Sequence, residues 1–291
     1  MTDTVLTAFG LGLLVQPPEP DHRAFAVPGG LRPLLDRHGV LLVRGLDLDG
    51  DRYREFASGF GPLETVFPVA HQEPGHPNVR LQSNVGVGVG SGGEYWHSDG
   101  PLTPTPTAVT LLLCREAPRS GGETLFADMR RAYDTLDPAV RDRVERRRGR
   151  YPCREIGLRE MRLAGIPEEE QRHRLTTLHD LSHPIVRPHP NTGRKALYLN
   201  QQWLQGFDDD PADTEELLPL LYAHATREDN VYRHHWCSGD LLVWDNDSVM
   251  HRALPPGDGA RKITRRITVA GGAAAAGADP RGGLATLEMT P

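Results

Sequence analysis

Residues 239–251 read Gly-Asp-Leu-Leu-Val-Trp-Asp-Asn-Asp-Ser-Val-Met-His. Glycine and aspartate open a turn, and the apolar run behind them predicts a buried strand over 241–244. The polar residues after Trp244 predict a second turn, so His251 is expected to lie on another strand. An imidazole presented from a rigid strand can join a site that is assembled from distant parts of the chain.

A second polar cluster lies far upstream, at Tyr95-Trp96-His97-Ser98-Asp99. Side chains at i and i+2 point to the same face of a strand, so His97 and Asp99 can reach one ion. Together with His251 they make two histidines and one carboxylate, the ligand set of non-haem Fe(II) oxygenases. By spacing alone, a zinc hydrolase with the same ligands and a bound water is the rival interpretation, and structural roles for both histidines stay open.

A cationic strand follows over residues 262–269, Lys-Ile-Thr-Arg-Arg-Ile-Thr-Val. Because the side chains of a strand alternate between its faces, Lys262 and Arg266 share one face. A buried cation without a counter-charge is costly, so each of them needs a partner. That partner is either a dianionic cosubstrate or a remote carboxylate in a structural salt bridge.

Other apolar patterns predict the rest of the frame. Helices are expected within 31–44, where one runs into a strand, and over 51–60, 134–147 and 214–226, with strands over 108–113, 121–126 and 195–200. The polar stretch 150–182 shows little alternation and is expected to be an insertion that serves as a lid. Gly, Ala and Pro dominate after 271, so 272–291 is expected to be a disordered tail.

The bulk properties narrow the class of protein. The 291 residues suffice for one sizeable core, so a single domain over 1–271 is expected. A net charge of -6 argues against a nucleic-acid partner, and three widely spaced cysteines argue against a cysteine zinc site. The short apolar stretch 9–15 follows no basic region, so neither a signal peptide nor a membrane span is expected, and the protein is expected to be cytoplasmic.

Several segments resemble, in order, the taurine dioxygenase (TauD/TfdA-like) family of Fe(II)/2-oxoglutarate-dependent oxygenases. They are HGVLLVRGL (38–46), FGPLE (60–64), WHSD (96–99), SGGETLFADM (120–129), HPIVRPHPNTGRKALYLN (183–200), GDLLVWDNDSVMH (239–251) and RKITRRITVAG (261–271). The resemblance implies a mainly β fold with flanking helices (α+β), a distorted double-stranded β-helix or jelly roll.

The resemblance also implies roles for particular residues. His97, Asp99 and His251 match the iron ligands. Thr124 matches a hydroxyl that helps to hold the far carboxylate of 2-oxoglutarate. Two basic positions follow the last ligand, and here they are Lys262 and Arg266. The first usually binds that carboxylate, and the second can reach an anionic substrate; lysine offers a point charge in place of a bidentate fork, so either residue can be the main clamp.

Two departures from the family pattern concern the substrate. Val66 or Phe67 stands where taurine dioxygenases carry a substrate-contacting histidine, and Gly93 stands where they carry an asparagine. Taurine is therefore not the expected substrate. Phe67, Tyr95 and Trp203 are the candidate pocket residues, although ordinary core packing explains Phe67 and Trp203 equally well.

The implied activity is that of a 2-oxoglutarate-dependent dioxygenase. It uses Fe(II), consumes 2-oxoglutarate and O2, and hydroxylates a small organic substrate, anionic or neutral, with release of succinate and CO2. Desaturation or another oxidation in natural-product biosynthesis is one alternative, and a non-catalytic metal-binding module is another. A small-molecule partner is expected, with no nucleic acid and no membrane, and a homo-oligomer is compatible with the sequence.

Overall fold

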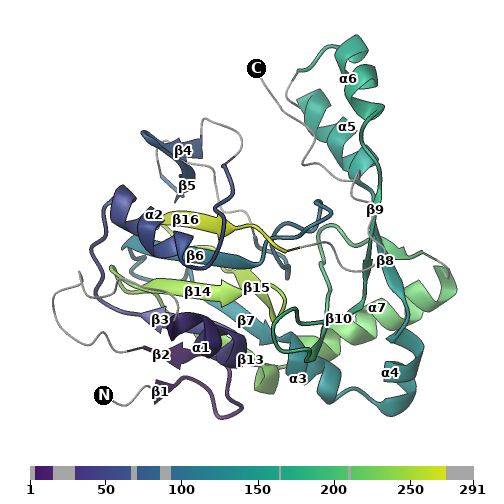
Figure 1. Cartoon of the computed structure of the whole chain (residues 1–291), viewed down its shortest axis with the longest axis horizontal. Helices are drawn as coiled ribbons and strands as arrows, with labels where there is room; N and C mark the ends of the chain where they lie inside the picture. Colours follow the sequence, from purple (N-terminus) through teal and green to yellow (C-terminus); the bar gives the residue numbers. More distant parts are fainter. Residues whose placement is uncertain are drawn as a thin grey trace.

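The computed structural model describes residues 4–15, 30–66, 71–85, 93–163, 165–208 and 211–272. Within them a large sheet faces a small one, and helices cover the outer sides (Figure 1). The large sheet runs in the order β1 (Thr4–Val5), β2 (Leu13–Leu14), β3 (Val40–Val43), β14 (Leu241–Asp245), β6 (Val109–Glu116), β16 (Ile263–Val269), β5 (His76–Ser83) and β4 (Gln72–Glu73). The small sheet runs in the order β13 (Val231–His234), β7 (Thr124–Asp128) and β15 (Val249–Ala253).

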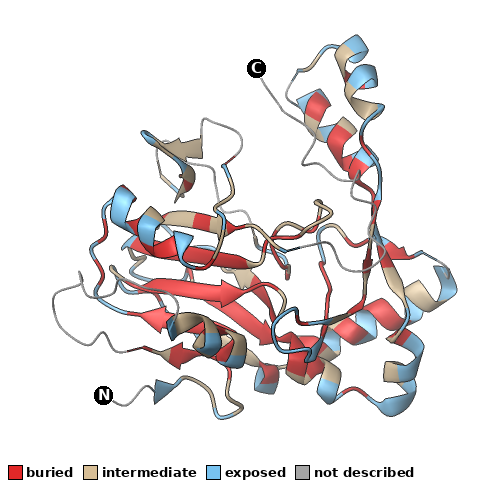
Figure 2. Ribbon diagram, in the orientation of Figure 1, coloured by how far each residue is buried: buried red, intermediate tan, exposed pale blue. Residues whose placement is uncertain are grey.

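Strand β14 lies at the centre of the large sheet, and its side chains alternate between two cores. It pairs antiparallel with β3 and β6, and all of its residues are buried. Leu241 and Val243 pack into an outer core with α1 (Leu31–His38) and α2 (Gly50–Ser58). Leu242 and Trp244 pack into an inner core between the two sheets. The period of two that the sequence predicts is therefore present, and Figure 2 shows the buried centre of the sheet.

The inner core joins the large sheet to the small one. Phe126 of β7 packs edge-on against Trp244 of β14, with ring centroids 5.5 Å apart. The ring of His251 on β15 packs against both of these rings, with its centroid 6.2 Å from that of Phe126 and 4.7 Å from that of Trp244. Packing of the large rings therefore fixes the strand that carries the second imidazole.

The remaining elements surround a third core on the far side of the small sheet. Its helices are α3 (Met129–Asp134), α4 (Pro138–Val144), α7 (Pro211–Ala225) and the short 3-10 helix η4 (Glu228–Asn230). Its strands form two further sheets, β12 (Gly206–Phe207), β8 (Arg148–Tyr151) and β9 (Leu181–Pro184), and β10 (Val186–Pro188) with β11 (Lys195–Leu197). Among the described residues, no helix combines the length and the apolar character needed to cross a membrane.

The helix predicted over 134–147 is wrong in its extent. Helix α3 already ends at Asp134, and α4 begins only at Pro138. The Asp137 side chain accepts a hydrogen bond from the Ala139 backbone N–H at 2.9 Å. An acidic cap followed by a proline is a start signal for a new helix, and it interrupts the charged periodic stretch.

The insertion predicted over 150–182 contains a helical hairpin. Helices α5 (Cys153–Leu163) and α6 (Glu168–Leu175) stand away from the sheets in Figure 1. The antiparallel pair β8 and β9 forms its base. Helix α6 buries only Gln171 among its described residues, so little apolar surface holds it to the body. A lid function stays a prediction, and the tail predicted over 272–291 lies outside the described residues from 273 onwards.

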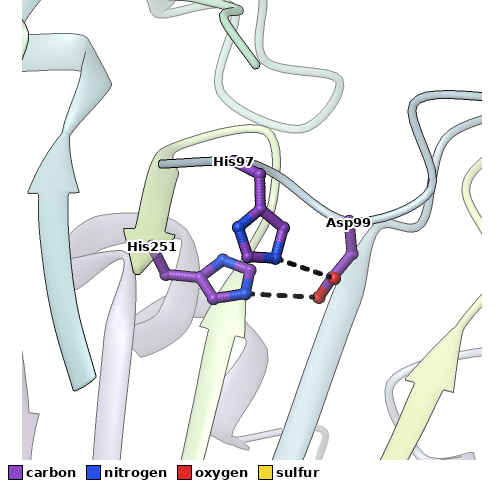
Figure 3. A group of neighbouring side chains, drawn as sticks. All are labelled: His97, Asp99 and His251. Carbon is purple, nitrogen blue, oxygen red and sulfur yellow. Dashed lines mark ion pairs between the residues drawn. The ribbon is translucent and has the colours of Figure 1, made fainter. Parts of the chain in front are cut away.

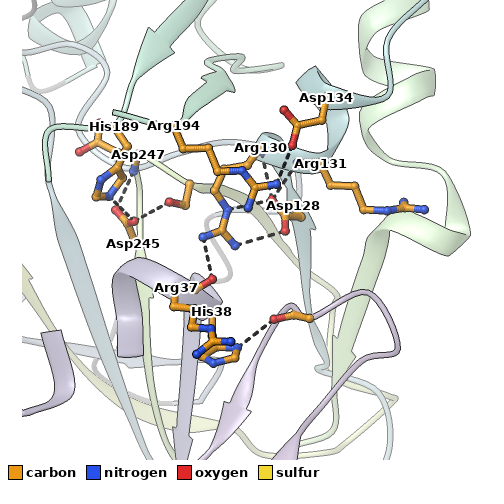
Figure 4. Close-up of polar contacts among 12 residues, drawn as sticks. Arg37, His38, Asp128, Arg130, Arg131, Asp134, His189, Arg194, Asp245 and Asp247 are labelled. Carbon is orange, nitrogen blue, oxygen red and sulfur yellow. Dashed lines mark hydrogen bonds and ion pairs between the residues drawn. The ribbon is translucent and has the colours of Figure 1, made fainter. Parts of the chain in front are cut away.

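A buried ion pair connects the third core to helix α1. Arg130 pairs with Asp128, with 3.1 Å between Nε and Oδ1 (Figure 4). The same guanidinium donates to the Asp36 and Arg37 carbonyl oxygens at 3.0 and 3.1 Å. Carbonyl groups in the last turn of a helix lack partners within the helix, so Arg130 satisfies two of them.

Candidate active site

His97 and His251 are brought together by a single β-bridge. The His97 N–H donates to the His251 carbonyl oxygen at 3.0 Å, and the His251 N–H donates back at 2.8 Å. His251 lies on β15, whereas His97 and Asp99 lie in an extended segment outside the named strands. This segment still points His97 and Asp99 toward His251, as Figure 3 shows.

The three side chains fit a single metal ion. His97 Nε2 lies 3.9 Å from Asp99 Oδ1, and His251 Nε2 lies 3.9 Å from Asp99 Oδ2. One ligand atom from each residue lies within 4.8 Å of the other two. Two ligand atoms at this separation can share one ion when each bond is roughly 2.1 Å long. Imidazole nitrogen and carboxylate oxygen are a donor set that suits Fe(II).

Both imidazoles are prepared to offer a lone pair. The Nδ1 of His97 lies 2.7 Å from the Tyr95 carbonyl oxygen, which can only accept, so Nδ1 carries the proton and Nε2 is free. Burial, followed by the neighbouring His97, holds the pKa of His251 well below its usual value. His251 is therefore neutral at pH 7, which is the form that binds metals.

Asp99 is held by three neighbours, two of which contact its carboxylate. Thr110 Oγ1 donates to Oδ2 at 2.6 Å, and Arg266 Nη2 lies 2.7 Å from Oδ1. Asn246 Oδ1 accepts from the Asp99 backbone N–H at 3.1 Å. Burial raises the pKa of Asp99, but the Arg266 guanidinium, helped by the Thr110 hydrogen bond, outweighs burial, and the pKa lies well below its usual range.

Thr110 and Asn246 are site residues that the sequence analysis missed. Asn246 Nδ2 donates to Thr110 Oγ1 at 3.0 Å, and Thr110 in turn donates to Asp99. The turn after β14 therefore orients the carboxylate through β6. Asn246 lies inside the quoted segment 239–251 and its polarity was a usable signal, whereas Thr110 is one hydroxyl in an apolar strand.

A second cluster of possible ligands, Asp36, His189 and Asp245, is fully hydrogen-bonded. His189 Nε2 lies 2.8 Å from Asp245 Oδ2 (Figure 4), and its Nδ1 accepts from the backbone N–H groups of Asn191 and Thr192 at 3.2 Å. Both ring nitrogens are thus committed, and no lone pair of His189 is left for a metal. This cluster instead fixes the turn between β14 and β15.

A cavity of about 460 Å³ opens at the three candidate ligands. Thr124, Lys262, Arg266 and Trp203 also line it, and their predicted binding roles stay predictions. Tyr95 does not line it and is 57% exposed, so its predicted place in the pocket is wrong. Phe67 lies outside the described residues.

Lys262 lines this cavity and stands just before β16. Its Nζ donates to the Gly122 carbonyl oxygen at 2.6 Å and lies 4.9 Å from the centre of the Trp236 ring. The Trp236 Nε1–H donates to Thr124 Oγ1 at 3.1 Å, so the ring links the ammonium to the hydroxyl. Burial lowers the pKa of Lys262 to about 8. The group is a cation near neutral pH, and none of the described carboxylates forms an ion pair with it.

Gly93 marks the wall beside His97. Its φ is +94°, a conformation that L-residues with side chains rarely adopt. A Cβ atom there would lie 3.0 Å from His97 Cε1. A side chain at residue 93 would therefore strain the backbone and press against the imidazole unless His97 moved.

The comparisons with known proteins agree on one family. Residues 15–268 match the taurine catabolism dioxygenase TauD, TfdA family. The chain belongs to this family. It is 33% identical over 250 residues to the alpha-ketoglutarate-dependent 2,4-dichlorophenoxyacetate dioxygenase of Cupriavidus pinatubonensis, with 81% of this chain and 85% of that protein covered. It is 32% identical to pentalenolactone F synthase of Streptomyces arenae over 255 residues, with 80% and 83% covered.

Solved structures of the family share the fold. A taurine dioxygenase from Burkholderia xenovorans superimposes with a TM-score of 0.74 at 24% identity, over 93% of this chain and 89% of that chain. The structure of AAD-2 in complex with Mn(II) and N-oxalylglycine gives a TM-score of 0.74 at 26% identity, over 93% and 98%. The protein is therefore a 2-oxoglutarate (alpha-ketoglutarate)-dependent non-haem iron dioxygenase that uses Fe(II), 2-oxoglutarate and O2.

Proposed function

We propose that this dioxygenase hydroxylates a small anionic organic substrate. In this proposal His97, Asp99 and His251 hold the iron, and Thr124 and Lys262 hold the far carboxylate of 2-oxoglutarate. One observation carries the proposal: the three metal-type donors, the Thr124 hydroxyl and the Lys262 ammonium all face the same cavity. Arg266 lines that cavity too and offers a second cation for the substrate.

The residues around the bound groups have three separate roles: they bind the cosubstrate, orient a metal ligand and position the substrate. When bound, iron and 2-oxoglutarate supply the activation of O2, with release of succinate and CO2 and oxidation of a substrate C–H bond. Lys262 and Thr124 bind one end of the cosubstrate, and this fixes the direction in which its other end points. Thr110 and Asn246 hold the Asp99 carboxylate in one orientation. The cavity wall decides which hydrogen atom of the substrate is presented.

We also propose a fold class, a domain boundary and a role for the insertion. We assign the two facing sheets to a distorted double-stranded β-helix and residues up to 271 to one oxygenase domain. The hairpin within 150–182 is assigned as a lid, because the guanidinium of Arg159 on α5 lies 5.5 Å from the centre of the Trp203 ring. Trp203 lines the cavity, so this contact connects the hairpin to the site.

A second candidate function is a different oxidation of a natural product. The similarity to pentalenolactone F synthase, at 32% identity, favours it as much as the similarity to the 2,4-dichlorophenoxyacetate enzyme favours an anionic substrate. The presence of Arg266 in the cavity favours an anionic substrate. A non-catalytic module is the weaker reading, because the donor set is complete and prepared for a metal.

The test is coupled turnover with a substrate panel. The protein with Fe(II), 2-oxoglutarate and air is incubated with 2,4-dichlorophenoxyacetate, an alkyl sulfate and a neutral lactone, and succinate and O2 uptake are measured. We expect succinate formation to rise with at least one anion and to stay at its background rate with the lactone. Succinate formation stimulated only by the lactone would support the second candidate function, and none above a protein-free control would contradict both.

The affinity for 2-oxoglutarate is expected to fall at alkaline pH. The Lys262 pKa of about 8 lies below the usual lysine value because of burial. The ammonium form binds the carboxylate, so affinity is full below pH 8 and declines as the pH rises above it. The decline is about tenfold per pH unit until the pKa of the bound form is reached. Calorimetric titration between pH 6.5 and pH 9.5 measures it, and Lys262→Arg should remove the decline because arginine stays charged.

A further inference from the structure

A second guanidinium stands beside Arg266. Arg80 on β5 is the direct cross-strand partner of Arg266 on β16, and both residues line the cavity. Like charges directly opposite each other on paired strands are destabilising. The chain therefore places two cations side by side at the wall of its site, against the electrostatic preference of the sheet.

The cavity does not hold enough negative charge for both groups. Among its described lining residues Asp99 is the only carboxylate, and it already pairs with Arg266 at 2.7 Å. Glu64 lies in a small adjoining pocket and accepts a hydrogen bond from Thr107 at 2.9 Å. In the loaded enzyme, Asp99 and the dianion of 2-oxoglutarate balance the iron dication and one ammonium. Arg80 is then left without a counter-charge, and Arg266 keeps only the Asp99 carboxylate, whose charge it shares with the iron.

The contacts of Arg80 leave its guanidinium available. One nitrogen, Nη2, lies 3.0 Å from His71 Nδ1. Nε is buried and has no hydrogen-bond partner among the described residues, and no described carboxylate lies within ion-pair distance of the group. Burial, and then the charge of Arg266, lower the pKa of Arg80. A buried donor without a partner costs free energy, and an incoming oxyanion would recover it.

We propose that Arg80 and Arg266 together form the substrate-anion subsite, which takes a carboxylate, sulfonate or sulfate group of the substrate. The inference rests on the proposed function, because it assigns the remaining cations after 2-oxoglutarate has taken Lys262. The new element is Arg80, a specificity-determining residue on β5, a strand that carries none of the metal or cosubstrate residues assigned above. Two guanidinium planes can bind an oxyanion through several charged hydrogen bonds at once.

The test measures binding to the full-length protein without oxygen. The complex with Fe(II) and 2-oxoglutarate is titrated with 2,4-dichlorophenoxyacetate, hexyl sulfate and the neutral 2,4-dichlorophenoxyacetamide, and the change in its visible charge-transfer absorption is followed. The proteins are wild type, Arg80→Met, Arg80→Lys and the control Arg261→Met. Arg261 is exposed and pairs with Glu116, so the control removes one positive charge near β16 but outside the cavity.

We expect the wild type to prefer the anions over the amide. Arg80→Met should weaken anion binding by about 10- to 100-fold and leave amide binding unchanged. The anion affinity of Arg80→Lys should lie between those of the wild type and Arg80→Met. The anion affinity of Arg261→Met should match that of the wild type. The charge-transfer band itself reports that each variant is folded and holds 2-oxoglutarate.

Three results would overturn the inference. The first is a wild-type complex that shows no preference for anions over the amide. The second is an Arg80→Met variant that binds anions as tightly as the wild type does. The third is an Arg80→Met variant whose affinity falls for 2-oxoglutarate and not for the anions. A weakening confined to hexyl sulfate, or confined to the carboxylate, supports the subsite and identifies its oxyanion. A wild-type protein without the band contradicts the proposed function itself, so the two failures are distinguishable.

Discussion

Replacing Asp99 with alanine is expected to lower turnover by more than about a thousandfold, because loss of a residue that merely supports a metal ligand already costs roughly 10- to 100-fold. The substitution removes the only anionic group of the three candidate ligands and also leaves the Arg266 guanidinium without its partner at 2.7 Å. Succinate formation at saturating 2-oxoglutarate measures turnover, and calorimetric titration with Fe(II) measures metal affinity.

A distant carboxylate provides the matched control. Asp229 is exposed and pairs with Arg131 and Arg227 at the surface, so Asp229→Ala should leave both quantities unchanged. Turnover of Asp99→Ala within tenfold of the wild type would remove Asp99 from the metal site. A folded variant is confirmed by its unchanged far-ultraviolet circular dichroism.

Replacing Lys262 with methionine is expected to raise the KM for 2-oxoglutarate by about 10- to 100-fold, the usual cost of a lost hydrogen bond to a charged group. Methionine keeps most of the length of the side chain but removes the ammonium group that lies over the Trp236 ring, which in turn donates to Thr124. Metal affinity should be unchanged, because Lys262 is not among the candidate ligands. Initial rates at varied 2-oxoglutarate measure the KM.

Two further variants separate charge from packing. Lys262→Arg should restore most of the affinity, since it keeps the cation, and Lys195→Met at an exposed ion pair with Glu145 should have no effect. An unchanged KM in Lys262→Met would transfer the clamp to Arg266. A KM that rises equally in Lys262→Arg would show that the fit of the lysine stem matters more than its charge.

The sequence predicts the residues that chemistry singles out. His97, Asp99 and His251 stand in segments whose polarity contrasts with their apolar surroundings, and Lys262 and Arg266 follow the period of a strand. These signals are local, and the structure brings all five residues to one cavity. The buried central strands are predictable from their apolar runs, whereas the arrangement of the strands in two sheets is implied only by the resemblance to the family.

The sequence does not predict the residues whose role depends on strand pairing. Arg80 becomes a neighbour of Arg266 only through the register of β5 against β16, and Thr110 reaches Asp99 only because β6 lies beside β14. Neither residue stands out among other charged or hydroxyl side chains in the sequence. The prediction for Tyr95 relied on its closeness to His97 in the sequence. The residue is exposed and does not line the cavity, so closeness in sequence is no guide to a place in the pocket.

The measurement that tests the central claim most directly is the visible absorption of the protein after Fe(II) and 2-oxoglutarate are added without oxygen. We expect a metal-to-ligand charge-transfer band in the wild type, because one cavity holds the candidate metal ligands and the proposed cosubstrate clamp. We also expect that His97→Ala and Asp99→Ala show no band. A wild-type protein without the band, or a band that persists in Asp99→Ala, would contradict the assignment of this site.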